Sequence, residues 1–291
     1  MKKLALSFGI ILLALSSVLA QNTTQKKLSY DRPVTSCEEQ WIVCPQGADS
    51  AYQFGFVFDQ GNGLTFRLEG AFEIDKNGDY VLLPKKKVNQ HANLGGSSDL
   101  VALIPANKYN QLKIGIFPSW YDIQSKKGEN VFKLYTEGYV ANARGEYDKA
   151  LIQLHKAYLL NPDYKNLRYQ FAVALNAKEL YAKADTVLRQ AMRTDRKSYK
   201  LYEELSFAQL QQRKVKQAVR TAKKGISLCK LNPPRAKMAI RLCIHFYHKK
   251  DKENFKIWMK ESRKYTVDGS MQALQIHDML KKSKKWPKKK K

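Results

Sequence analysis

Two consecutive stretches of 34 residues decide how half of this chain folds: VFKLYTEGYVANARGEYDKALIQLHKAYLLNPDY at 131–164 and KNLRYQFAVALNAKELYAKADTVLRQAMRTDRKS at 165–198. Both carry tyrosine at position 17, alanine at positions 20 and 27, and leucine at position 24. Position 8 is small in each, Gly138 in the first and Ala172 in the second. A fixed repeat with small residues at fixed positions predicts helix pairs that pack closely and stack on one another.

Two further units follow with weaker matches. The third begins at Tyr199, and a small insertion separates it from the fourth, which begins at about Ala236 and has bulky residues where small ones are usual. We therefore expect about four helix pairs over 131–269, the last one degenerate, and a capping helix over 270–282. Its apolar residues would cover the open end of the stack, as solenoids require: Met271, Leu274, Met279 and Leu280.

These units resemble the tetratricopeptide repeat family, whose unit is two antiparallel helices with small residues where they cross. The resemblance covers about half of the chain and rests in the first unit on Leu134, Gly138, Tyr147, Ala150, Leu154, Ala157 and Pro162. It implies a solenoid whose first helices line a concave groove for a protein or peptide partner. Carried over position by position, the groove residues are Tyr135, Tyr139, Asn142, Asn166, Tyr169, Asn176, Lys200, Phe207, Lys237 and Arg241.

Residues 34–125 have the period of strands and turns. Four aromatic residues alternate along one stretch, namely Tyr52, Phe54, Phe56 and Phe58, which places their rings on one face of a strand. We expect them in a core, with a stacking platform for sugars or bases as the alternative.

A second strand over 64–74 is expected to pair an apolar face with a charged one and to form a long hairpin with the first strand. The runs Leu100–Ile104 and Leu112–Phe117 would add strands or a covering element. The fold class is thus α+β, with a small N-terminal β-rich domain followed by an all-α repeat solenoid.

The first twenty residues have the pattern of a signal peptide. Lys2 and Lys3 precede a nearly all-apolar stretch from Leu4 to Leu15, and small residues end at Ala20. Cleavage there would leave a polar leader over 21–33 and place the protein in the periplasm, the cell envelope or outside the cell; an uncleaved anchor is the alternative. No later segment reaches the roughly 20 apolar residues that span a bilayer.

The four cysteines would then lie in an oxidising compartment, where disulfides can form. Cys37 and Cys44 are close enough in sequence to close a short loop with a disulfide, and two free thiols are the alternative. Cys229 and Cys243 are expected to be buried thiols, because the helical rise would offset them by about 10 Å.

The formal charge of +26 is concentrated in the second half. Residues 1–127 hold 14 Lys and Arg against 11 Asp and Glu, while residues 128–291 hold 38 against 15. Such a field attracts polyanions, and export favours acidic protein, anionic glycolipid or polysaccharide over nucleic acid. The lysine-rich tail at 283–291 is expected to be disordered, and either binds an anionic membrane surface or only aids solubility.

The motifs of common catalytic sites are absent from the sequence. It has no phosphate-binding glycine loop, no Gly-x-Ser-x-Gly elbow and no His-Glu-x-x-His helix. We therefore expect no enzyme, cofactor or metal, but an exported adaptor that binds a protein or peptide through the repeat groove. The alternative is a cell-envelope protein that binds anionic glycolipid or polysaccharide through its basic C-terminal half.

Overall fold

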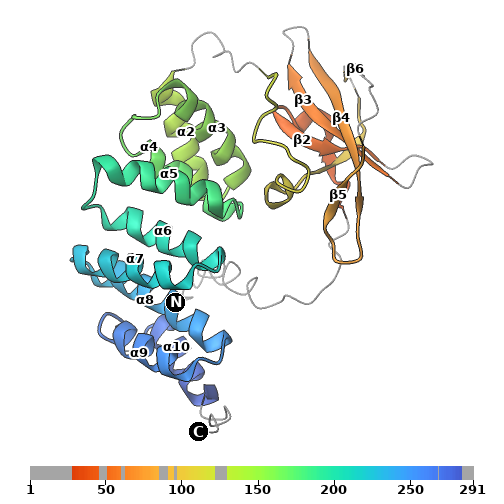
Figure 1. Cartoon of the computed structure of the whole chain (residues 1–291). Helices are drawn as coiled ribbons and strands as arrows, with labels where there is room; N and C mark the ends of the chain where they lie inside the picture. The colour runs from red at the N-terminus through yellow and green to blue at the C-terminus, as the bar shows by residue number, and fades with distance from the viewer. Residues whose placement is uncertain are drawn as a thin grey trace, which may run out of the picture. The chain divides into compact units, whose positions relative to one another are not determined.

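The computed structural model describes residues 28–45, 51–59, 63–84, 91–94, 97–121, 130–267 and 269–283. The signal sequence expected at 1–20, most of the leader and the tail from residue 284 onward lie outside them. The chain divides into two compact units, one of residues 1–104 and 108–118 and the other of residues 105–107 and 119–291. The first is built on strands and the second on helices (Figure 1), which confirms the predicted α+β class.

An antiparallel sheet forms the first unit. Its strands are β1 (Arg32–Pro33), β2 (Gln40–Val43), β3 (Tyr52–Asp59), β4 (Leu64–Ile74), β5 (Tyr80–Leu82), β6 (His91–Asn93) and β7 (Leu100–Leu103). They lie in the order β1-β7-β2-β3-β4-β5, and β6 also pairs with β4. Two short 3-10 helices, η1 (Val34–Ser36) and η2 (Ala106–Lys108), belong to the connections.

A β-bulge interrupts the long hairpin of β3 and β4. Leu68 lies opposite Gly55, whereas Gly70 lies opposite Phe54, so β4 holds one extra residue at this point. The extra residue reverses the face on which the following side chains lie. Phe72 therefore packs with Phe54, at 5.9 Å between ring centroids. The prediction of one continuous apolar face along 64–74 was wrong, because alternation does not reveal a bulge.

Three of the four aromatic residues predicted in the core of β3 are buried there, and the fourth, Tyr52, is half-buried. Phe54, Phe56 and Phe58 are only 2, 0 and 7% exposed. Trp41 of β2 lies against Phe56, with 5.1 Å between ring centroids, and its indole nitrogen donates to the carbonyl oxygen of Gly115 at 3.1 Å. The run 112–117 thus covers this face of the sheet instead of adding a strand.

The predicted disulfide between Cys37 and Cys44 is not formed, and both are free thiols. Strand β2 lies between them, and its four residues alone span about 13 Å at the rise of an extended chain. That separation exceeds what a disulfide can bridge. Cys229 and Cys243 are free and fully buried, as predicted.

The second unit consists of helix pairs in sequence. Its helices are α2 (Val131–Arg144), α3 (Tyr147–Leu160), α4 (Leu167–Ala177), α5 (Tyr181–Thr194), α6 (Tyr199–Gln211), α7 (Val215–Leu228), α8 (Asn232–His248), α9 (Lys252–Arg263) and α10 (Met271–Ser283). Figure 1 shows them stacked in chain order. Among the described residues, no helix combines the length and the apolar character that a membrane crossing needs.

The turn inside each helix pair repeats the same backbone geometry. Position 15 of the four units is held by Gly145, Glu179, Arg213 and Lys250, and all four have a positive φ between 53 and 76°. In each unit the next residue donates its backbone N–H to the carbonyl oxygen of position 11, at 2.8 to 3.0 Å. This left-handed closure is a common end of a helix. It places the fourth unit in the register that starts at Ala236.

Close packing of α2 against α3 depends on Gly138. A Cβ atom at this position would lie 2.5 Å from Cγ of Leu154, which is fully buried together with Ala150 and Ala157. The small residues therefore stand where the two helices cross, as the 34-residue register predicts.

The last helix, α10, covers the fourth pair with a different set of residues from the one expected. Ile276 and Met279 are buried in the cluster that contains Phe255 and Trp258 of α9, and Leu280 packs against it. Met271 and Leu274 are exposed, so half of the predicted covering set was wrong. The covering stripe begins at Ile276 and continues at spacings of three and four residues.

Candidate functional site

The first helices of the pairs form one wall of the repeat array. Helices α2, α4, α6 and α8 contact one another from each pair to the next, whereas within the described residues the second helices make few such contacts. A stack curves toward the side on which neighbouring helices lie closer. The wall of first helices is therefore the inner one, where the register places the expected groove.

A cavity of about 580 Å³ opens on this wall. Half of the ten expected groove residues line it, namely Tyr135, Tyr139, Asn166, Tyr169 and Lys200. Its other lining residues are Asp163, Tyr164, Lys165, Arg168, Gln170, Ala191, Thr194, Asp195, Ser198 and Leu201. The volume lies in the range of binding sites for small ligands or a few side chains.

Tyrosine rings dominate the cavity. Tyr135 of α2 lies 5.1 Å from Tyr164 and 6.3 Å from Tyr139, measured between ring centroids. Tyr169 of α4 carries the ammonium group of Lys200 at 5.9 Å from its ring centroid. Tyr139 is 48% exposed, so its ring is the most available to a partner.

Burial raises the pKa of two of the phenols that line this cavity. The pKa of Tyr135 is raised by burial first and by the neighbouring Tyr139 and Tyr164 second. The pKa of Tyr169 is also raised, by burial first and then by the carboxylates of Glu204 and Glu203. Both phenols can donate and accept a hydrogen bond at neutral pH.

Two of the expected groove residues join neighbouring helices. Asn142 of α2 donates from Nδ2 to the backbone oxygen of Gln170 in α4 at 2.9 Å and to its Oε1 at 3.0 Å. Asn176 of α4 makes the equivalent pair of bonds to Glu204 in α6, at 3.2 and 2.9 Å. Both stand at position 12 of their unit, so the amides fasten successive first helices. Sequence register placed them on the correct wall but could not assign this role.

The remaining three expected residues form a separate cluster farther along the array. Arg241 stacks over the ring of Phe207 at 4.5 Å and lies 3.9 Å from a carboxylate oxygen of Glu204. Lys237 pairs with Glu203 at 2.5 Å. These two cations are therefore held by carboxylates of the chain itself, and this site is not set up to capture the carboxylate of a peptide.

Sequence reasoning missed the turn residues of the cavity. Tyr164 holds position 34 of the first unit and Ser198 position 34 of the second, so both lie in connections between units and not on a first helix. Asp163 pairs with Arg168 at 2.6 Å beside them. The sequence signal that could have identified Tyr164 was an aromatic residue at the last position of a repeat. The direction in which its ring points depends on how one unit packs on the next.

The charges of the cavity are partly compensated. Asp195 accepts the backbone N–H groups of Lys197 and Ser198 at 3.2 and 3.0 Å. Lys165 and Lys200 line the cavity without an ion pair among the described residues. Elsewhere in the described part of the chain, no three His, Cys, Asp or Glu side chains gather as a metal site would require.

Comparisons with known proteins give weak similarities. No family model matches the chain, and no curated protein matches it. Among solved structures, MamA from Desulfovibrio magneticus is similar at 20% identity over 48% of this chain and 80% of its own, with a TM-score of 0.41. A tetratricopeptide repeat protein from Parabacteroides merdae is similar at 16% identity over 62% of this chain and 63% of its own, also with a TM-score of 0.41. These scores are too low to support a statement about function, and the repeat architecture rests on the helices and turns of the chain itself.

Proposed function

We propose that this chain is a non-catalytic scaffold whose repeat array binds a protein or peptide partner in the tyrosine-lined cavity of the inner wall. The observation that carries the proposal is the convergence of Tyr135, Tyr139, Tyr164 and Tyr169 around one cavity of about 580 Å³. These rings come from α2, α4 and the turn before α4. Three separate segments thus contribute to one recessed surface.

Tyrosine suits this role for physical reasons. The ring gives a large contact area at a low cost in side-chain entropy, and the neutral phenol satisfies polar groups of a partner. Asn166 adds an exposed amide at the rim, held in a left-handed conformation with φ of 63° at the start of α4. A rigid aromatic surface with polar groups at its edge is typical of sites that bind peptide segments.

A photo-crosslinking amino acid at position 139 tests the proposal in the native cell. We expect a specific crosslinked partner from this position and none from position 159. Leu159 is the matched control, because it is 53% exposed but lies on a second helix, α3. A partner that crosslinks equally from both positions would contradict the proposal.

Binding of the purified partner then gives the energetic test. Tyr139→Ala should weaken binding by about 2 kcal/mol, the scale of an interface hot spot, with helical circular dichroism unchanged. Phe132→Ala is the control, since Phe132 is an aromatic residue of α2 that is 64% exposed and does not line the cavity. Equal losses of binding affinity in both variants would show that the cavity is not the binding site.

Recognition through charge alone makes a different prediction. In that case binding should fall steeply with salt and tolerate Tyr139→Ala, whereas removal of residues 284–291 should abolish it. If the tyrosine cavity recognises the partner, loss of this tail changes mainly the association rate and its salt dependence.

Export is part of the proposal. Residues 1–20 carry the pattern of a signal peptide, and removal of this segment would leave Gln21 as the first residue. N-terminal sequencing of the protein from fractionated cells tests this. Recovery of a chain that begins at Met1 from the cytosol would contradict export.

A further inference from the structure

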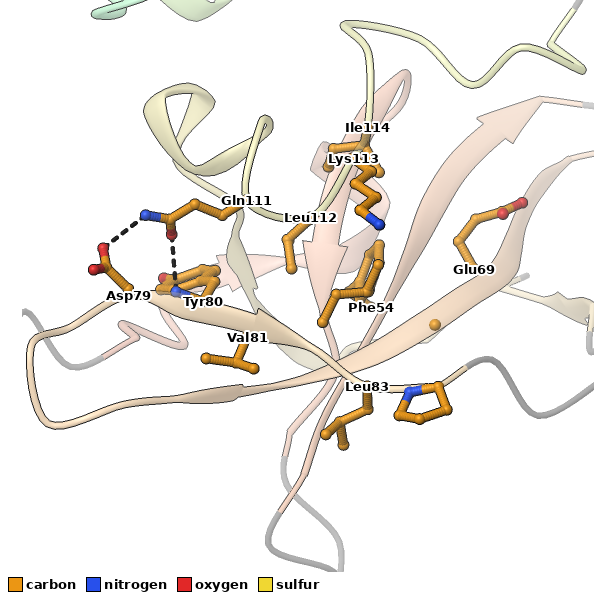
Figure 2. A pocket seen from close by; sticks show the side chains of 13 residues that line it. Phe54, Glu69, Asp79, Tyr80, Val81, Leu83, Gln111, Leu112, Lys113 and Ile114 are labelled. Carbon is orange, nitrogen blue, oxygen red and sulfur yellow. Dashed lines mark hydrogen bonds between the residues drawn. The ribbon is translucent and has the colours of Figure 1, made fainter.

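The first unit has its own cavity, separate from the groove of the repeats. It has a volume of about 900 Å³ and lies between the β4–β5 end of the sheet and the covering segment 111–114. Figure 2 shows Leu112 and Lys113 extending from this segment toward Phe54. The neighbouring lining residues on the strand side are Glu69, Gly70, Asp79, Tyr80, Val81, Leu82, Leu83 and Pro84.

Strand β5 lies at the end of the sheet order, so one edge of its backbone pairs with no other strand of the described sheet, and its residues line this cavity. The backbone N–H of Asp75 donates to the carbonyl oxygen of Asp79, and the backbone N–H of Leu83 donates to that of Ala71. Residues 79, 81 and 83 therefore direct their backbone groups toward β4. Hydrogen-bonded and non-bonded pairs alternate along an antiparallel ladder. The N–H and C=O groups of Tyr80 and Leu82 therefore face away from β4.

A side chain already occupies the first of these outward positions. The backbone N–H of Tyr80 donates to Oε1 of Gln111 at 2.8 Å, and Nε2 of Gln111 donates to Asp79 Oδ1 at 2.6 Å (Figure 2). The amide of Gln111 thus takes the place that the backbone of another strand would have. The next outward groups, the N–H and C=O of Leu82, have no hydrogen-bond partner among the described residues.

The charges around this edge favour an acidic partner. Glu69 pairs with Arg67 at 3.1 Å, and Asp79 pairs with Lys108 at 3.2 Å, so both carboxylates have a cation beside them. Lys113 is exposed and has no ion pair within the described part of the chain. The cavity therefore combines an unpaired strand edge, an apolar floor at Phe54 and Leu112, and one uncompensated positive charge.

We propose that an extended acidic segment of a partner protein adds to the outer edge of β5. Its backbone bonds to the N–H and C=O of Leu82, an apolar side chain enters the cavity, and an acidic side chain pairs with Lys113. Addition of a strand in this way uses main-chain bonds for affinity and alternate side chains for specificity. The inference is independent of the groove in the repeat array.

The test uses the full chain and a fluorescent heptapeptide of alternating valine and glutamate, at physiological salt. Lys113→Glu should weaken its binding at least tenfold, whereas Lys76→Glu, an equal change of charge in the β4–β5 turn, should change it less than twofold. Leu82→Pro should also weaken binding at least tenfold, because proline removes the outward N–H but no bond to β4. Equal binding by the parent and by Lys113→Glu would overturn the proposal.

Amide hydrogen exchange in the parent protein gives a second readout that needs no variant. The peptide should slow exchange of the Leu82 amide at least tenfold, and a peptide N-methylated at alternate residues on its bonding edge should not. Unchanged Leu82 exchange with saturating peptide would refute strand addition, as would equal binding of the N-methylated peptide. Protection that rises with protein concentration without peptide would instead assign the edge to a second copy of the chain.

Discussion

Replacement of Gly138 by alanine tests the helix crossing on which the repeat architecture depends. In an exposed helix this change would stabilise the chain by about 1 kcal/mol, because glycine is a poor helix former. Here the added Cβ would lie 2.5 Å from Cγ and 2.8 Å from Cδ2 of Leu154. Carbon atoms in contact are about 3.5 to 4.0 Å apart. Leu154 must therefore move by about 1 Å or the helices must separate.

The structure allows Leu154 little room to move. Its side chain is fully buried, and Ala150 and Ala157 beside it are fully buried as well. Overpacking of this kind costs about 1 to 3 kcal/mol. After subtraction of about 1 kcal/mol for the gain in helix propensity, we expect Gly138→Ala to lower the free energy of unfolding by up to about 2 kcal/mol.

A double-mutant cycle separates the clash from any other effect. Leu154→Ala alone should cost about 2 to 5 kcal/mol through the cavity it leaves. In the double variant the new methyl group enters that cavity without a clash, so the two losses should fall short of additivity by at least about 1 kcal/mol.

Urea unfolding followed by helical circular dichroism measures these changes, since the α-helices of the described residues all belong to the second compact unit, which contains the repeat array. Thr136→Ala is the control, because Thr136 is exposed on the same helix, and it should stay within about 0.5 kcal/mol of the parent. A Gly138→Ala variant more stable than the parent by about 1 kcal/mol would refute the close approach.

Three further predictions concern a titrating side chain, the thiols and the turns. Burial lowers the pKa of His155 from 6.5 to about 4. The contribution of its neutral form to stability is therefore complete above pH 6.5 and is lost as the pH falls toward 4. His155→Phe should remove roughly 3 kcal/mol of that pH dependence, measured by urea unfolding at a series of pH values. A chain purified without reductant should give four thiols in a thiol titration after unfolding. A count of two would instead support the disulfide between Cys37 and Cys44. Arg213→Gly should raise the free energy of unfolding by about 0.5 to 1 kcal/mol because Arg213 has a φ of 61°, whereas Gly145→Ala should lower it by about 1 kcal/mol; equal effects would contradict the repeated turn.

The groove residues show which features the position within a repeat can predict and which it cannot. Position in the repeat placed Tyr135 and Tyr139 on the wall of first helices, and both line the cavity there. It could not tell that the amide of Asn142 is already bonded to Gln170, because that bond joins two units. It also missed Tyr164, whose ring reaches the cavity from a connecting turn.

The β-rich unit depends even more on contacts between distant residues. The alternation of β3 predicted the core role of its phenylalanines. Strand β2 was not predicted, because Cys37 and Cys44 favoured a stapled loop. Its place in the sheet comes from pairing with β3 on one side and with β7 on the other. The apolar pattern of β4 likewise did not predict the bulge opposite Gly55.

The sequence by itself determined the helical repeats of this protein, including the small residues at the crossings of the first two units and the register of all four units. It could do so because each unit packs on neighbours within a few tens of residues, so that spacing along the chain implies contact in space. Only the tertiary structure decided the order of the strands, the state of Cys37 and Cys44, and which polar groups of the groove remain available. Those features depend on pairing between residues such as Ile42 and Leu103, whose separation in sequence carries no information about their contact.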